Sequence, residues 1–156
     1  MVKSFTAENL RQLSDKAKQA ERMRANLNVH ESLDADVQRL FIATEPGTYI
    51  RPHRHSEAHK WEFFMVITGE IDLLIFNDEG ALSQRIVMAP DQTRAIELPA
   101  NTWHSYVCKK TGTVALEVKQ GAYIPTPETD FAAWAPAENS AEAAAYLQWM
   151  SEAQPV

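Results

Sequence analysis

The chain is poor in cysteine and glycine and has no long apolar run. Its 156 residues include five glycines and one cysteine, Cys108. One cysteine excludes an intrachain disulfide and a cysteine-built zinc site, which leaves histidine and carboxylate side chains as ligands for a metal. No apolar run exceeds five residues, whereas a membrane helix needs about 20. A secretory signal also needs a longer apolar segment, so we expect a cytoplasmic protein.

Basic residues are in the minority. The chain has 15 Lys and Arg against 21 Asp and Glu, a net charge of −6. This balance argues against nucleic acid or an anionic membrane as a partner. The charge is uneven, because residues 1–27 are basic on balance while residues 128–156 carry five acidic residues and no basic one. The two ends can attract each other or a partner, although solvated helix faces explain the pattern equally well.

The composition is that of one folded domain spanning residues 1–156. The hydrophobic fraction is 45% and the charged fraction 23%, both ordinary for globular proteins. Leu10, Leu13, Ala17 and Ala20 recur every three or four residues, which predicts an N-terminal helix over about 7–24. The alanine-rich segment after Pro136 predicts a C-terminal helix over about 140–151.

Residues 37–120 have the texture of a mainly β domain. Short runs rich in Val, Ile, Phe and Tyr end at turn residues, which is typical of an antiparallel sandwich or barrel. Eight strands, the jelly-roll number, are predicted at about 37–44, 48–55, 61–67, 71–76, 84–88, 95–98, 103–108 and 113–119. Residues 63–67 are apolar on both faces. We therefore expect a helix or a second copy of the chain, in a homodimer, to cover their outer face.

Histidines are concentrated in this β region. His53, His55 and His59 lie within seven residues. Residues two apart in a strand face the same side about 7 Å apart, so His53 and His55 can bind one ion. The same pair is also common on exposed strands that bind no metal. His30 stands apart, and a hydrogen-bonded or solvated side chain is expected there.

The residues around these histidines resemble the cupin superfamily. Its first motif, G-x5-H-x-H-x(3,4)-E-x6-G, is matched by Gly47, His53, His55, Glu62 and Gly69. Pro99 and His104 match its second motif. The resemblance implies a single-domain jelly-roll barrel, also called a double-stranded β-helix. It further implies one divalent transition metal ion held by His53, His55, Glu62 and His104.

The chain departs from the cupin motifs at several positions. Six residues separate His55 from the glutamate, so His59 falls where a short-spacer cupin has its glutamate. The intact E-x6-G spacing favours Glu62 as the fourth ligand, with His59 as the alternative. In the second motif, Thr93 and Asn101 replace glycines and Cys108 replaces asparagine.

A second resemblance covers nearly the whole chain. The segments that carry it are RMRANLNVH (22–30), VQRL (37–40), RPHRH (51–55), KWEF (60–63), PANTWH (99–104) and FAAWAPAE (131–138). They are similar to the WbuC family of small cupin-fold metalloproteins, some of which are encoded among polysaccharide biosynthesis functions. This resemblance implies a metal-binding cupin but no particular reaction. The metal can be Zn, Fe, Mn, Ni or Co, since imidazole and carboxylate ligands suit all of them.

Four protein ligands in an octahedron leave two positions open, as a catalytic ion requires. The favoured hypothesis is a metal-dependent enzyme, an isomerase, epimerase or oxygenase, acting on a small polar metabolite such as a sugar derivative. The alternatives are a noncatalytic metal-assisted binding or sensing module and a metal-free sugar epimerase, against which the histidine cluster argues. Four side chains are expected to line the pocket: Tyr49, Arg51, Trp103 and Tyr106. Gln38 and Asn101 are expected to orient the ligating imidazoles.

Overall fold

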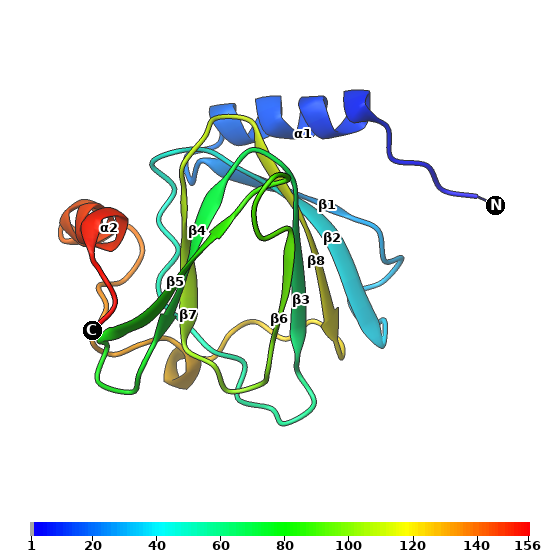
Figure 1. Cartoon of the computed structure of the whole chain (residues 1–156). Helices are drawn as coiled ribbons and strands as arrows, with labels where there is room; N and C mark the ends of the chain where they lie inside the picture. The colour runs from blue at the N-terminus through cyan, green and yellow to red at the C-terminus, as the bar shows by residue number, and fades with distance from the viewer. Residues whose placement is uncertain (1) are drawn as a thin grey trace.

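The computed structural model describes residues 2–156 and shows two antiparallel sheets packed face to face (Figure 1). The larger sheet has the order β1 (Arg24–Asn28), β2 (Val37–Thr44), β8 (Thr113–Gln120), β3 (Glu62–Thr68) and β6 (Ala95–Leu98). The smaller sheet has the order β5 (Leu82–Met88), β4 (Ile71–Phe76) and β7 (His104–Cys108). The protein thus has the mainly β jelly-roll architecture that the sequence predicts.

The core lies between the two sheets and follows from the two-residue period of the strands. Inward positions of β3, such as Phe64 and Val66, alternate with the half-buried outward residues Phe63 and Met65. The buried side chains that form this core are Leu40, Ile42, Phe64, Val66, Ile71, Leu73, Met88, Leu98, Tyr106 and Ala115. One end of the space between the sheets is polar instead, and the candidate site lies there.

A helix covers part of the outer face of each sheet. α1 (Ala7–Gln19) is capped by the Thr6 side chain and packs Leu13 and Ala17 against the larger sheet. α2 (Ala143–Glu152) buries Met150 against Phe76 of the smaller sheet. A short 3₁₀ helix, η1 (Glu128–Asp130), lies in the segment before α2. None of the helices in residues 2–156 combines the length and apolarity that spanning a membrane requires.

The N-terminal helix is shorter than predicted. It ends at Gln19, and Arg24–Asn28 form the edge strand β1, where the sequence predicts helix as far as about residue 24 and no strand. Met23 adopts a left-handed φ of 56° between the two elements. β1 pairs along its whole length with β2. If the helix continued instead, the backbone N–H and C=O groups at this edge of β2 would have no partners.

The strand predicted over 48–55 is also absent. His53 makes only isolated bridges, one to His104 and one to Phe131. Pro52 has no N–H to donate to a strand pairing. The Ile50 carbonyl accepts a hydrogen bond from the Ser105 hydroxyl and not from the backbone N–H of a neighbouring strand. The segment therefore runs beside β7 in irregular conformation. The eight observed strands include β1 in its place.

The outer face of β3 is covered only in part. α1 packs on β1, β2 and β8, and Phe63, Met65 and Ile67 remain half-buried. The homodimer therefore stays a prediction.

Candidate metal centre

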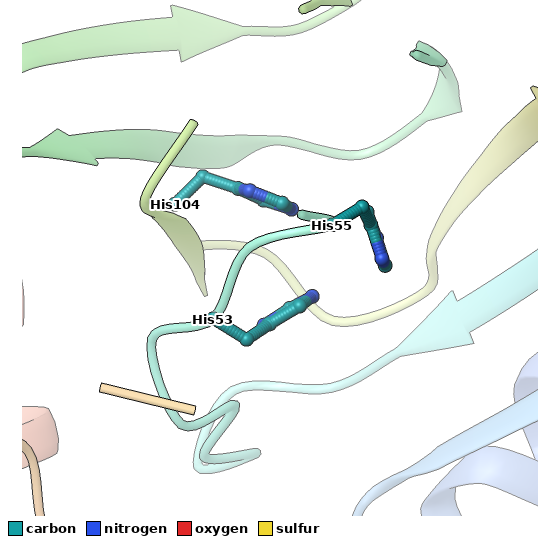
Figure 2. Close-up of side chains that lie close together, drawn as sticks. All are labelled: His53, His55 and His104. Carbon is teal, nitrogen blue, oxygen red and sulfur yellow. The ribbon is translucent and has the colours of Figure 1, made fainter. Parts of the chain in front are cut away.

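Three histidines from two distant parts of the chain meet at the polar end of the barrel (Figure 2). His53 and His55 come from the irregular segment between β2 and β3, and His104 begins β7. The backbones of His53 and His104 exchange two hydrogen bonds of 3.0 and 2.9 Å, which brings the two motifs together. One ring nitrogen from each histidine lies within 4.8 Å of the others.

Glu62 lies beside two of these histidines, His55 and His104. As the first residue of β3 it faces inward, with Phe64 and Val66, and it is 5% exposed. Its Oε2 lies 3.1 Å from His55 Nε2 and 3.5 Å from His104 Nε2. His59, the alternative ligand, lies outside the group, because its exposed ring reaches Glu57 at 3.5 Å instead.

Backbone carbonyls set the ring orientation of two of the histidines. His53 Nδ1 lies 3.0 Å from the oxygen of Arg51, and His104 Nδ1 lies 2.9 Å from the oxygen of Thr102. A carbonyl only accepts, so each Nδ1 carries a proton, and each Nε2 is the nitrogen left to bind a metal once it is deprotonated.

Gln38 and Asn101 do not take the orienting role expected of their side chains. The Gln38 amide donates to the carbonyls of Leu33 and Ala35. Asn101 acts through its backbone N–H, which donates to the His55 carbonyl at 2.7 Å. The sequence does not reveal that the Nδ1 atoms of His53 and His104 find their partners in backbone carbonyls two residues away. No side chain is then needed to orient these rings.

Burial and mutual contact perturb the titration of the cluster. Burial, reinforced by the neighbouring His104, lowers the pKa of His53 to about 3. Burial acts to raise the pKa of Glu62, but hydrogen bonds from His104 and His55 outweigh it and hold that pKa well below its usual value. The same carboxylate overcomes the effect of burial on His104 and raises its pKa. At neutral pH the group therefore offers one carboxylate and a neutral His53.

This donor set fits a divalent transition metal. Metal–nitrogen and metal–oxygen bonds of about 2.0–2.2 Å place ligand atoms that share an ion about 3–4 Å apart. One nitrogen from each histidine lies within 4.8 Å of the others, and Glu62 Oε2 lies 3.1 Å from His55 and 3.5 Å from His104. Side-chain adjustments can therefore bring the four residues to one ion. Imidazole and carboxylate together suit several metals and select none.

A cavity of about 160 Å³ adjoins the four residues. Tyr106 lines it, as the sequence predicts, together with Phe64 and Leu73. Its remaining lining residues are Arg24, Asn26, Ile42, Ile50, Leu98, Glu117 and Lys119, in addition to the three histidines and Glu62.

Three side chains expected in the pocket lie elsewhere. The Tyr49 hydroxyl donates to the Pro136 carbonyl. Arg51 turns toward the C-terminal segment and pairs with Glu128. The indole of Trp103 donates to Asp78. In each case a partner distant in sequence holds the side chain, which no local pattern reveals.

Two charged residues of β8 were missed. Glu117 and Lys119 form an ion pair on the inner face of the sheet, next to Glu62 in the strand register. Burial raises the pKa of Glu117, whereas the carboxylates of Glu117 and Glu62 overcome burial and raise that of Lys119. The alternation of β8 puts Ala115, Glu117 and Lys119 on one face, and this signal could have found them.

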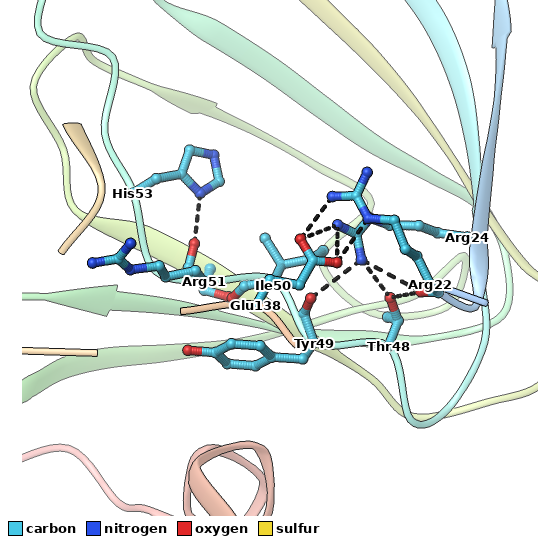
Figure 3. A network of polar contacts seen from close by, with 9 residues as sticks. Arg22, Arg24, Thr48, Tyr49, Ile50, Arg51, His53 and Glu138 are labelled. Atoms are coloured by element: carbon cyan, nitrogen blue, oxygen red, sulfur yellow. Dashed lines mark hydrogen bonds and ion pairs between the residues drawn. The ribbon is translucent and has the colours of Figure 1, made fainter. Parts of the chain in front are cut away.

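Arg24, also missed, ties β1 to the segment that leads to His53 (Figure 3). Its guanidinium donates to the Thr48 hydroxyl at 3.1 Å and to the Tyr49 carbonyl at 3.2 Å. It also pairs with Glu138 at 2.8 Å, and Arg22 pairs with the same carboxylate at 2.7 Å. The basic N-terminal part and the acidic C-terminal part thus meet at Glu138.

The C-terminal segment supports the histidine segment from its other side. The backbone N–H of Arg54 donates to the Asp130 carbonyl, and that of Ala132 donates to the Pro52 carbonyl, both at 2.9 Å. The buried Asp130 side chain also accepts from the Ser56 hydroxyl at 2.8 Å. The His-x-His segment is therefore held between β7 and residues 130–132.

Solved structures with a similar fold include several enzymes. KdgF from Halomonas sp. aligns with 14% identity and a TM-score of 0.52, over 64% of this chain and 80% of its own. Oxalate oxidase in complex with the substrate analogue glycolate aligns with 18% identity and a TM-score of 0.51, over 69% and 55%. A variant oxalate decarboxylase from Bacillus subtilis aligns with 17% identity and a TM-score of 0.51, over 70% and 28%. These likenesses establish the cupin fold.

Comparison with curated proteins gives no match. The profile of one family, described as a domain of unknown function, DUF6016, matches residues 5–88. The matched region includes His53, His55 and Glu62 and more than half of the chain. The chain therefore belongs to the DUF6016 family and has the cupin fold.

Proposed function

We propose that this protein is a metal-dependent enzyme that acts on a small polar metabolite, with a sugar derivative as the leading candidate. The observation that carries the proposal is the meeting of His53, His55, His104 and Glu62 at the wall of a cavity of about 160 Å³. A structural ion needs no adjoining space, since its protein ligands close the coordination sphere. Here a small molecule has room beside the ligand atoms.

Each part of the site has a role in this proposal. The four residues hold the ion, which would polarise an oxygen of the bound substrate as a Lewis acid. Phe64, Leu73 and Tyr106 form an apolar wall that excludes water. Lys119 Nζ presents N–H groups beside the Glu117 carboxylate, so this pair can orient a polar group of the substrate.

Two comparisons support the substrate class. Oxalate oxidase and oxalate decarboxylase are named for a small dicarboxylate, and the oxidase accommodates glycolate, a two-carbon hydroxy acid. The sequence resemblance to the WbuC family adds the polysaccharide context. Together they favour a hydroxylated or carboxylated small molecule as the substrate.

Metal content is the first test. Protein purified without chelator is offered Zn, Fe, Mn, Ni or Co singly, and elemental analysis counts the ions bound per chain. We expect one ion for the wild type and for His59→Ala, and well under one for His53→Ala. A wild type that holds well under one ion after this treatment would contradict the proposal.

Turnover is the second test. The metal-loaded protein is incubated with small hydroxy acids and sugar derivatives, with and without chelator, and products are followed by mass spectrometry. Chelator-sensitive turnover supports the enzyme. Saturable binding without turnover across the panel favours the noncatalytic binding or sensing module.

A further inference from the structure

A second cavity, of about 270 Å³, lies beside the first along the inner face of the larger sheet. The two cavities share four wall residues, Asn26, Ile42, Glu117 and Lys119, so they adjoin. β1 is the edge strand of this sheet, and its inward residues Asn26 and Asn28 are exposed. The second cavity therefore leads from the candidate metal centre toward solvent at β1.

His30 points to a ligand in this second cavity. Its side chain lines the cavity, and the residue is 8% exposed. Nδ1 faces the backbone of Arg39, 2.9 Å from its oxygen and 3.0 Å from its nitrogen. Within residues 2–156, Nε2 is buried and has no hydrogen-bond partner. Such unpaired nitrogens are rare because they are costly, so this one is suited to a group supplied from outside.

The other walls suit hydroxyl groups. Asn26 and Asn28 bring amides, which donate and accept as hydroxyls do. Glu117 and Lys119 form an ion pair, so their charges offset each other, which favours a neutral ligand there. At the outer end the Tyr123 ring is 52% exposed and offers a flat face to the C–H side of a sugar or polyol.

We infer that the second cavity binds the hydroxylated chain of a substrate whose carboxylate or hydroxyl head lies at the metal centre. His30 Nε2 bonds to one hydroxyl and the Asn28 amide to another. This inference rests on the proposed function and narrows it. The substrate class becomes polyhydroxylated acids or sugars that are longer than a two-carbon acid.

Two probes with the same head group separate the cavities. Glycolate carries a 2-hydroxy carboxylate alone, and D-gluconate adds a polyol chain to it. Calorimetry with metal-loaded wild type is expected to show gluconate binding about tenfold more tightly than glycolate, as a few net hydrogen bonds allow. His30→Asn keeps an atom in the place of Nδ1 but has nothing in the place of Nε2. It should lose most of the gluconate advantage and leave glycolate affinity unchanged.

Asn28→Ala is the second variant. Asn28 is exposed, so its truncation leaves the core intact and covers the case in which His30→Asn fails to fold. It should likewise weaken gluconate alone. His59→Asn is the matched control, since His59 lines neither cavity, and it should bind both probes as wild type does.

A direct readout is the ¹⁵N resonance of His30 Nε2, which should shift with gluconate and not with glycolate. Equal affinity of wild type for both probes with an unmoved His30 resonance overturns the inference, as does a gluconate advantage retained in the folded variants. Failure of glycolate to bind the metal-loaded wild type counts against the proposed function instead. In that event the His30 resonance in the presence of gluconate still decides whether the second cavity binds a polyol.

Discussion

His55 Nε2 and Glu62 Oε2 lie 3.1 Å apart, although six residues separate the two in the chain. The intervening loop carries His59 outward to solvent, where it pairs with Glu57. The strand β3 holds Glu62, and the Asn101 N–H holds the backbone of His55, so the two groups meet without help from the loop between them.

Removing the Glu62 carboxylate should weaken metal binding strongly. Glu62→Ala deletes the only acidic group in the cluster, so affinity should fall by more than the roughly 10–100-fold that loss of a supporting residue costs. Competition with a metal-binding dye measures it. His59→Ala is the control, and equal losses in the two variants would show that Glu62 has no special role.

Loss of Asp130 should weaken the metal centre from a distance. Its side chain accepts from the Ser56 hydroxyl and pairs with the Arg54 guanidinium, on either side of His55. Asp130→Ala should therefore reduce metal affinity by about 10–100-fold while every proposed ligand remains. Glu128→Ala, an exposed change in the same short helix, should have little effect. Unaltered affinity in Asp130→Ala would argue that β7 alone positions the histidines.

Metal should stabilise the fold through the same four residues. At a free metal concentration of 100 times Kd, binding contributes about 2.7 kcal/mol. For a domain of this size that corresponds to a rise in Tm of about 5–10 °C. Thermal unfolding with and without metal tests this in the wild type and in His53→Ala combined with His104→Ala. The double variant should show no rise, and a rise equal to that of wild type would place the ion elsewhere.

The Glu138 ion pairs should make stability depend on pH in the acid range. Burial acts to raise the pKa of Glu138, but Arg22 and Arg24 outweigh it and lower that pKa below its usual value. A lowered folded pKa means that the stabilisation is present above the unfolded value, about 4.3, and is lost as pH falls through the folded value. Glu138→Gln should cost about 1–2 kcal/mol at pH 7.

Urea unfolding at several pH values measures this effect. The gap between wild type and Glu138→Gln should close as pH drops below about 4. Glu79→Gln, an exposed loop change, should follow wild type throughout. A constant gap from pH 7 to pH 3 would mean that Glu138 acts by packing and not by charge.

The proposed homodimer rests on the half-buried apolar side chains that β3 leaves on its outer face, Phe63, Met65 and Ile67. A second copy that covers them should give twice the chain mass of 17.6 kDa in light scattering at micromolar concentration. Met65→Lys places a charge in that face and should shift the mass toward the monomer. A wild type of monomer mass would show that the chain needs no second copy to cover this face.

Local patterns in the sequence determined seven of the eight strands and the metal-binding residue types. Alternation in residues 62–66 places Glu62 on the same face as Phe64 and Val66, since side chains in a strand have a period of two. Glycine ends the E-x6-G motif because Gly69, in the turn after β3, has a φ of 80°, a conformation that side chains rarely adopt. Such constraints act within a few residues, so they can be recognised without the fold.

Tertiary structure decided the rest, because it depends on contacts between residues far apart in the chain. His104 reaches His53 through a backbone bridge, and Asp130 reaches Arg54 across 76 positions. β1 exists because β2 offers an unpaired edge, which outweighs the helical pattern that precedes it. His30 enters a cavity wall for the same reason, as the chain that follows β1 turns back onto Arg39.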